Sequence, residues 1–406
     1  MKANNLLGIF EFLISQAEKL PNPHCERIKK ELVSIKELLM DARAPRILII
    51  GRRGAGKSSL INAIFSEKVA EVGSVVSETG KATWHVFENS KGAVHILDTR
   101  GIGDRTKPES ANFEEAIDDI KAEIANEFPD VVLFLAPAKG IDSHINQDLK
   151  SVATIRKFIE NKYQYNIPVI AALTQVDELD PKQVGPPFDN ERKHNNIKLA
   201  VSTLADACTD FKIELMKIIP VSAYSDYIDG KITYKCHWNI DLLIEYLIKA
   251  LPNSAQLQMA RLTSLRNIQI KSARILIGST ATICAGIAST PIPLADVIPI
   301  TSSQILMITG IAYVSGRELS KKSAMEFMAA LGLNISLAYA LKEGARALVK
   351  FVFPGAGNVV SASIAFAGTW GIGEAAIAYF IEEVSIEEVK KTFTREKKKY
   401  LKEKPE

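Results

Sequence analysis

The stretch RILIIGRRGAGKSSL at residues 46–60 decides the fold, because an apolar run leads directly into a glycine-rich loop and then into a helical pattern. The spacing Gly51-x-x-x-x-Gly56-Lys57-Ser58 is that of a phosphate-binding loop. Glycines let the backbone point successive N–H groups at phosphate oxygens, and the following helix adds its N-terminal dipole. Lys57 can reach the β- and γ-phosphates of a nucleotide, and the Ser58 hydroxyl can bind Mg²⁺. The predicted nucleotide-contacting residues of this loop are Gly51, Arg52, Arg53, Gly54, Ala55, Gly56, Lys57, Ser58 and Ser59.

The chain changes texture twice, which predicts three segments: N-terminal helices at 1–44, an α/β domain at 45–252 and a C-terminal helical domain at 253–406. In the middle segment short β-branched runs alternate with helical patterns, as in a mostly parallel, doubly wound sheet. The predicted strands are RILII (46–50), ATWHVFE (82–88), AVHILDT (93–99), DVVLFLAP (130–137), PVIAALT (168–174) and KIIPVSA (217–223). We expect the two end segments to pack together as one all-α module, because neither is expected to bury its apolar face alone.

Two further motifs follow the loop in the order that a nucleotide site requires. In VHILDTRG, Asp98 ends an apolar strand and can hold a magnesium-bound water, and the N–H of Gly101 can contact a γ-phosphate. In AALTQVDEL, the predicted base loop is Thr174, Gln175 and Asp177. A carboxylate at Asp177 accepts from both N1–H and the exocyclic amine of guanine, a donor pair that adenine lacks. Ser222 and Ala223 follow a later strand, where a backbone N–H could meet guanine O6.

The motifs GRRGAGKSS, DTRG, TQVD and VSA resemble, in order and spacing, the TrmE–Era–septin superfamily of GTPases, and within it the Era-like and immunity-related GTPases. The resemblance covers roughly residues 45–252. It implies a Ras-like fold, binding of GTP, GDP and Mg²⁺, and GTP hydrolysis. It also implies a switch threonine that binds magnesium together with Ser58 and Asp98. We favour Thr79 for it, with Thr83 as the alternative. One departure is Thr-Gln where the family has Asn-Lys before the aspartate, so the lysine stem that normally lies over the base is replaced by a shorter amide.

The sequence also lacks two of the usual means of activation. Ile102 follows the D-x-x-G motif, and an isoleucine cannot orient the attacking water. Gly54 stands where potassium-activated relatives have asparagine. The candidate catalytic residues are therefore Lys57, Arg53 and Thr79, with Arg53 or its neighbour Arg52 as an arginine finger in cis or across a homodimer formed through the nucleotide face. Arg100 and Arg105 are further candidates. We expect slow hydrolysis without dimerisation or a partner.

The C-terminal segment contains long uncharged stretches. Between Arg274 and Arg317 only Asp296 is charged, and 351–373 is a second uncharged run. Three interpretations stay open: a buried helical hairpin, a hairpin that inserts conditionally into a membrane, or a constitutive transmembrane hairpin. Residues 265–385, including TPIPLADVIPITSSQILMITGIAYVSG, resemble a helical domain of unknown function that follows Era-like GTPase domains in bacteria. That domain is often considered membrane-associated.

The overall charge of +3 and the lack of an aromatic–basic pattern argue against a DNA partner. The leading prediction is a cytoplasmic GTP switch whose nucleotide state controls the helical module, peripheral to or inserted in the cytoplasmic membrane through lipid contacts of the C-terminal helices. The alternative is a soluble regulatory GTPase that recruits a protein or ribosomal partner. An ATPase with a degenerate base pocket is the third.

Overall fold

The structure is a computed structural model that describes residues 3–65, 82–98, 109–228, 231–263, 265–289, 297–330 and 362–403. These residues form two compact units, one of 44–255 and one made of 1–43 together with 256–406. The boundary falls within helix α8 (Asn253–Leu262). Predictions for Thr79, Arg100, Gly101, Ile102 and Arg105 lie outside the described residues.

The sheet of the first unit has the order β2-β3-β1-β4-β5-β6 among the described strands. Its strands are β1 (Arg46–Ile50), β2 (Thr83–Asn89), β3 (Gly92–Asp98), β4 (Val131–Pro137), β5 (Val169–Thr174) and β6 (Lys217–Pro220). All neighbours pair in parallel except β2, which runs antiparallel to β3 at the edge. β4 and β5 are buried along their whole length, as continuous apolar runs in a parallel sheet should be. The predicted doubly wound α/β class is confirmed.

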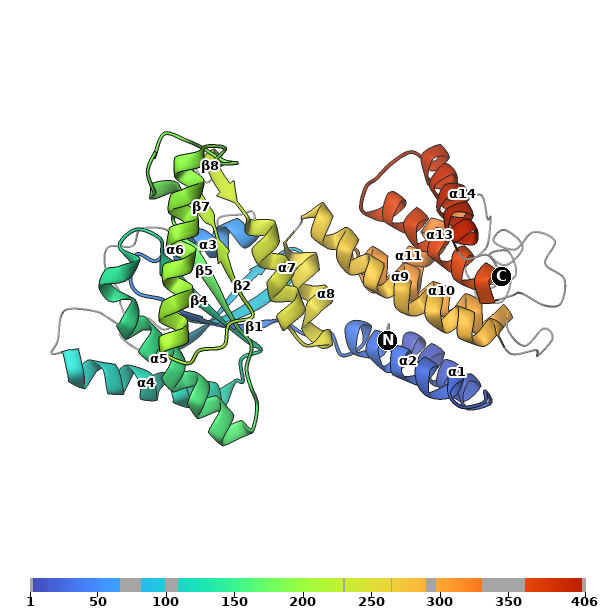
Figure 1. The fold of residues 1–406 in the computed structure, drawn as a ribbon. Helices are drawn as coiled ribbons and strands as arrows, with labels where there is room; N and C mark the ends of the chain where they lie inside the picture. The colour runs from blue at the N-terminus through green and yellow to red at the C-terminus, as the bar shows by residue number, and fades with distance from the viewer. Residues whose placement is uncertain are drawn as a thin grey trace. The chain divides into compact units, whose positions relative to one another are not determined.

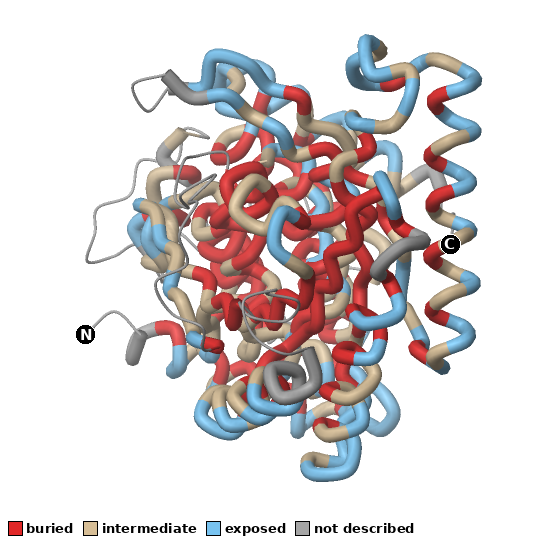
Figure 2. The backbone as a smooth tube through the Cα atoms, turned by 90° about the vertical axis from the view of Figure 1, so that its left-hand side faces the viewer, coloured by how far each residue is buried: buried red, intermediate tan, exposed pale blue. Residues whose placement is uncertain are grey.

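Helices cover both faces of this sheet (Figure 1). On one face lie α4 (Glu109–Asn126), α5 (Ile141–Tyr163) and α6 (Glu191–Asp210), whose buried aliphatic residues join those of the strands in one apolar core. On the other face lie α3 (Lys57–Phe65) and α7 (Ile240–Ala250). Figure 2 shows the buried strands beneath helices whose residues alternate between buried and exposed. This layering places the carboxyl ends of β1, β3 and β5 at one edge of the sheet.

One strand prediction was wrong at its end. The run 217–223 was expected to be a single strand, yet β6 ends at Pro220 and Ser222 begins β7 (Ser222–Ile228), which pairs antiparallel with β8 (Lys231–Trp238) in a separate ribbon. The amide of Val221 still donates to Leu173 O across 2.8 Å. Beyond Val221 the chain pairs with β8 instead of β5, and a continuous apolar run in the sequence does not reveal this change of pairing strand.

The second unit is all helical in its described part. It comprises α1 (Ala3–Ala17), α2 (His24–Leu39), α9 (Arg266–Ala288), α10 (Val297–Val314), α11 (Lys321–Ala330), α13 (Ala362–Phe380) and α14 (Ile386–Glu403), with the last part of α8. α9 packs against α2, α10 and α13, so the two chain ends do share one module, as predicted.

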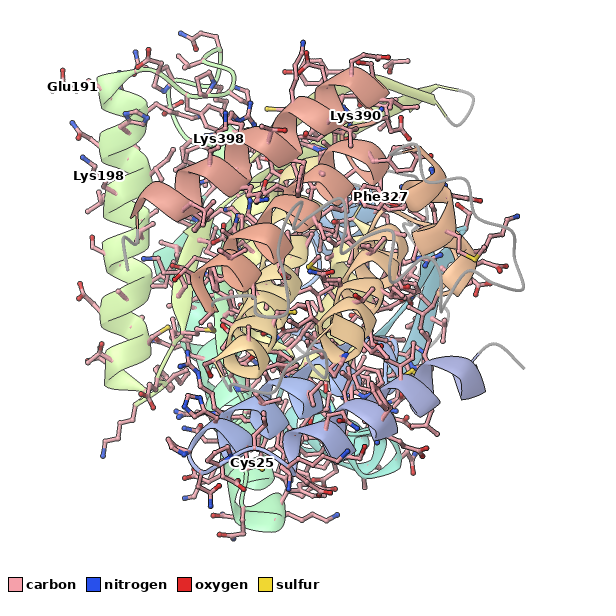
Figure 3. All side chains as sticks on the ribbon, turned by 90° about the vertical axis from the view of Figure 1, so that its right-hand side faces the viewer. Cys25, Glu191, Lys198, Phe327, Lys390 and Lys398 are labelled. Atoms are coloured by element: carbon pink, nitrogen blue, oxygen red, sulfur yellow. The ribbon has the colours of Figure 1, made fainter. Side chains whose placement is uncertain are left out.

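Small residues set the helix spacing in this module. A Cβ built on Gly373 of α13 would lie 2.4 Å from Ile277 Cγ1 of α9. Figure 3 labels Phe327 of α11, a fully buried ring whose centroid is 5.8 Å from that of Phe380. Arg274, which precedes the first uncharged run, donates to both carboxylate oxygens of Glu374, which follows the second, at 2.8 and 3.0 Å. The described apolar helices therefore bury most of their apolar side chains against one another.

Candidate nucleotide-binding site

The glycine-rich loop joins β1 directly to α3, as the sequence predicts. Gly51 passes so close to β4 that an added Cβ would lie 3.0 Å from Leu135 O. Gly54 and Gly56 have φ of +78° and +84°, the left-handed conformation that side chains disfavour. The glycines at these positions are therefore required by the backbone path, and that path turns the loop around the start of α3.

Lys57 is the first residue of α3, and its ammonium folds back over the loop. Its Nζ donates to Gly51 O at 2.6 Å and to Arg52 O at 3.4 Å. The same atom lies 3.8 Å from Asp98 Oδ1. The motif spaced about 40 residues downstream thus reaches the phosphate loop, and a cation and a carboxylate meet at the helix N-terminus.

Asp98 ends β3, and its Cα pairs in register with that of Ile49 in β1. The residue is 9 % exposed. Across the antiparallel pair, Asp98 is the register partner of Thr83, the alternative switch threonine, which is exposed at the start of β2. Thr83 is thus the described threonine next to the carboxylate, while the favoured Thr79 lies outside the described residues.

The predicted base loop touches the phosphate loop directly. Thr174 Oγ1 donates to Ala55 O at 2.8 Å, and Gln175 Nε2 donates to Gly54 O at 2.7 Å. Gln175 itself has φ of +59°. The two loops are separated by about 120 residues of chain, and these bonds hold them together at the carboxyl edge of the sheet.

Sequence reasoning missed Lys193, which supports this loop from α6. Its side chain is fully buried, and Nζ donates to Asp177 O at 2.8 Å and to Leu179 O. The ammonium also lies over the Phe188 ring, 5.0 Å from its centroid. Burial lowers the pKa of Lys193, against the opposing charge of Asp177. A lysine on a charged helix is typical of a solvated face, so no pattern in the sequence marked it.

Ser222 and Ala223 stand at the start of β7, beside the base loop. Val176 N donates to Val221 O at 3.4 Å, which joins the two segments. The Ser222 hydroxyl is fully buried and donates to Cys236 O in the ribbon. The Ser222 side chain therefore stabilises the ribbon, and the predicted contact to a base would be made by a backbone N–H.

The remaining predicted residues have varied positions. Ala55 is buried, Ser58 and Ser59 are half-buried in the first turn of α3, Arg52 is half-buried and Arg53 is exposed. The left-handed glycine cradle, the Lys57 ammonium and the Asp98 carboxylate form a donor set that fits a nucleotide polyphosphate with Mg²⁺.

A family model described as "50S ribosome-binding GTPase" matches residues 46–175. This segment is a P-loop GTPase domain of the TrmE–Era–septin type, as the resemblance of the motifs implied.

Relatives and solved structures extend the comparison. The tRNA modification GTPase MnmE of Ureaplasma parvum serovar 3 is 30 % identical over 163 residues, 39 % of this chain and 33 % of the relative. GTPase Der of Lacticaseibacillus paracasei is 31 % identical over 144 residues, 34 % of this chain and 29 % of Der. The chain thus spans about a third of the length of these relatives. The structure of Toc33 from Arabidopsis thaliana with Mg²⁺ and GMPPNP covers 58 % of this chain and 96 % of its own, at 15 % identity and a TM-score of 0.37.

Proposed function

We propose that the protein is a GTP-binding and GTP-hydrolysing switch. The observation that carries the proposal is the meeting of three motifs: Lys57 lies 3.8 Å from Asp98, and the Gln175 amide bonds the loop that precedes Lys57. Asp177 follows on the same loop, where its carboxylate can accept from guanine N1–H and the 2-amino group. The match of 46–175 to a GTPase family supports the same assignment.

Separate groups of residues would contact the phosphates, the magnesium ion and the base. The N–H groups of 51–59 and the Lys57 ammonium bind phosphate oxygens. Ser58 and Asp98, with Thr79 or Thr83, would hold Mg²⁺, which when bound would neutralise charge on the phosphates. Thr174, Gln175 and Asp177 orient the base, with the backbone at Ser222 and Ala223 nearby. This division leaves the aiming of the attacking water unassigned among the described residues, so hydrolysis by the monomer should be slow.

An arginine finger from Arg53 or Arg52 of a second copy would complete the site. The exposed position of Arg53 in the loop supports this arrangement. The test is the GTPase turnover number measured across a wide range of protein concentration. A rise with concentration that is lost in Arg53→Ala supports catalysis by the homodimer. A flat profile assigns the slow hydrolysis to the monomer alone.

The second unit suggests two candidate outputs for the switch, association with a membrane and recruitment of a partner. Within the described ranges one helix, Arg266–Ala288, is long and apolar enough to cross a membrane, and half of its most apolar window is buried. Ile275 of this helix is 51 % exposed. We rank the soluble regulatory switch first, because the described apolar helices mostly bury one another, and association with the cytoplasmic membrane second.

Co-sedimentation separates these outputs. The protein is centrifuged with anionic liposomes and, separately, with ribosomal subunits, each with GTP, GDP or no nucleotide. Binding to liposomes in one nucleotide state only supports the membrane output. Binding to a ribosomal subunit in one state supports recruitment to a partner such as the family description names. Binding to liposomes in no state removes the membrane candidate.

A further inference from the structure

The ribbon β7–β8 brings two exposed tyrosines beside the base loop. Tyr224 is 46 % exposed and Tyr234 is 51 % exposed, and their ring centroids lie 6.0 Å apart. Two exposed aromatic rings in contact on a polar ribbon leave apolar surface in water, which needs an explanation when they adjoin a site. The ribbon begins with Ser222 and Ala223 of the last predicted motif, and the rest of it was not predicted from the sequence.

The register of the ribbon places both rings on the same face of the ribbon. Ser222 pairs with Trp238, Tyr224 with Cys236, and Asp226 with Tyr234. Alternate residues of a strand share a face, so these pairs lie on one side of the ribbon. At the base of that side Ser222 and Cys236 are buried, and Trp238 packs against the apolar core. This side of the ribbon is therefore buried in the core at one end and carries the exposed tyrosine pair further along.

The ribbon is joined to the base loop at two points. The amide of Val176 bonds the carbonyl of Val221, three residues before Tyr224. From the other flank, the Trp238 ring meets the Phe188 ring at 5.2 Å between centroids, and Phe188 lies under the Lys193 ammonium that donates to Asp177 O. The ribbon, the Lys193 support and the Asp177 loop are one packed assembly.

The raised pKa values of both tyrosines include an effect of the Asp177 charge. The pKa of Tyr224 is raised, first by its hydrogen bond to Asp226 and, among smaller causes, by the charge of Asp177. The pKa of Tyr234 is raised, first by Cys236 and also by Asp177. Both phenols thus lie within the electrostatic reach of the group that would read the base.

The base loop itself leaves a face of the base to be covered. Gln175 occupies the place of the lysine whose stem would lie over the base, and its amide is held by Gly54 O at 2.7 Å. A purine bound edge-on to a carboxylate gains most from an aromatic ring against its π-face. The tyrosine pair lies within reach of the charge of Asp177, two residues further along the same loop.

We propose that Tyr224, backed by Tyr234, stacks on the guanine base held by Asp177 and replaces the missing lysine stem. The proposal rests on the proposed GTP-binding function. It assigns the β7–β8 ribbon as a wall of the nucleotide site, so that affinity for the base depends on ring area as well as on the hydrogen bonds of the base edge.

The test is isothermal titration of the full chain, with Mg²⁺, using guanosine diphosphate, inosine diphosphate and inorganic tripolyphosphate. Inosine keeps the π-face but lacks the 2-amino group. Tyr224→Ala should raise the Kd for both nucleotides by a similar factor of about ten, in the range of aromatic stacking, and leave tripolyphosphate binding unchanged. Tyr234→Ala should raise the Kd for both nucleotides by a smaller factor. Tyr224→Phe should bind both nucleotides with the wild-type Kd. Asp177→Asn should instead change the ratio of the two Kd values.

The matched control is Tyr165→Ala. Tyr165 is 42 % exposed and precedes β5, so it lies at the edge of the sheet opposite the carboxyl ends of the strands. It should leave all three Kd values unchanged. Wild-type affinity for both nucleotides in Tyr224→Ala would overturn the stacking proposal and leave the proposed function standing. A loss of tripolyphosphate binding in that variant would also overturn it, because the ring would then serve the fold of the site. Absence of nucleotide binding by the wild type would overturn both.

Discussion

The side-chain amide of Gln175 donates to the carbonyl oxygen of Gly54 across 2.7 Å, so the base loop and the phosphate loop hold one another in place. The stem of a lysine at position 175 would lie over the base, whereas the side-chain amide of this glutamine donates to the phosphate loop. We expect the pair to stabilise the nucleotide-ready arrangement of both loops, and the first prediction tests that.

Gln175→Ala should raise the Kd for guanosine diphosphate about two- to tenfold, the range of a single hydrogen bond. The chain provides a matched control in Gln164, which has the same left-handed backbone (φ +53° against +59°) and also donates its amide to a backbone oxygen, that of Asn161. Gln164 is the C-cap residue that follows α5, and its replacement by alanine should leave the Kd unchanged. Equal Kd values in the two variants would contradict the coupling of the loops.

Lys193→Met should weaken guanosine diphosphate binding about tenfold and lower the free energy of unfolding by about 1–3 kcal/mol, because two buried carbonyls lose their donor. Tripolyphosphate binding should persist, since Lys193 donates to carbonyls of the base loop. Lys198→Met is the control, five residues later on α6, where Lys198 is exposed (Figure 3). If both variants bind and unfold alike, Lys193 does not support the base loop.

The ribbon should lose stability in acid through His237, whose pKa is lowered to about 4, first by burial and then by the charge of Lys235. The unfolded chain binds this proton near pH 6.5, so between about 6.5 and 4 it holds more protons than the folded chain. Stability from this group is therefore full above pH 6.5 and is lost as the pH falls towards 4. His237→Gln should remove roughly 1 kcal/mol of that decline, a figure reduced for solvent screening. Melting temperatures across this pH window that fall equally in both proteins would exclude His237.

In the helical unit, Gly373→Ala should lower the free energy of unfolding by about 1–3 kcal/mol, because the new Cβ would lie 2.4 Å from Ile277 Cγ1. Gly278→Ala is the control on the facing helix α9. Its nearest neighbour, Trp370, would be 4.0 Å away, so helix propensity should make that change neutral or stabilising by up to about 1 kcal/mol. Urea unfolding of the two variants measures the difference. Equal losses would mean that the spacing of α9 and α13 does not depend on Gly373.

The sequence was enough to predict the sheet and the order of the motifs, because a parallel sheet needs long apolar runs and a phosphate loop needs glycine at fixed positions. Both are local properties of the chain. The placement of Asp98 beside Lys57 followed from the same logic, since parallel strands end at one edge.

The ribbon and Lys193 could not be predicted in the same way. The pairing of Ser222 with Trp238 depends on where the chain finds a second strand, and the run 217–223 reads as one strand on its own. The burial of Lys193 depends on carbonyls of a loop 16 and 14 residues earlier in the chain. Position 193 has the same charge and helix propensity as any solvated lysine.

The most direct test of the central claim is a competition titration of the purified chain with Mg²⁺, in which guanosine and adenosine diphosphates compete for the site. We predict that guanosine diphosphate binds and that a hundredfold excess of adenosine diphosphate does not displace it. We also predict that Lys57→Ala abolishes binding and that Asp177→Asn loses the preference for guanine. Equal competition by adenosine diphosphate, or full binding by Lys57→Ala, would contradict the account.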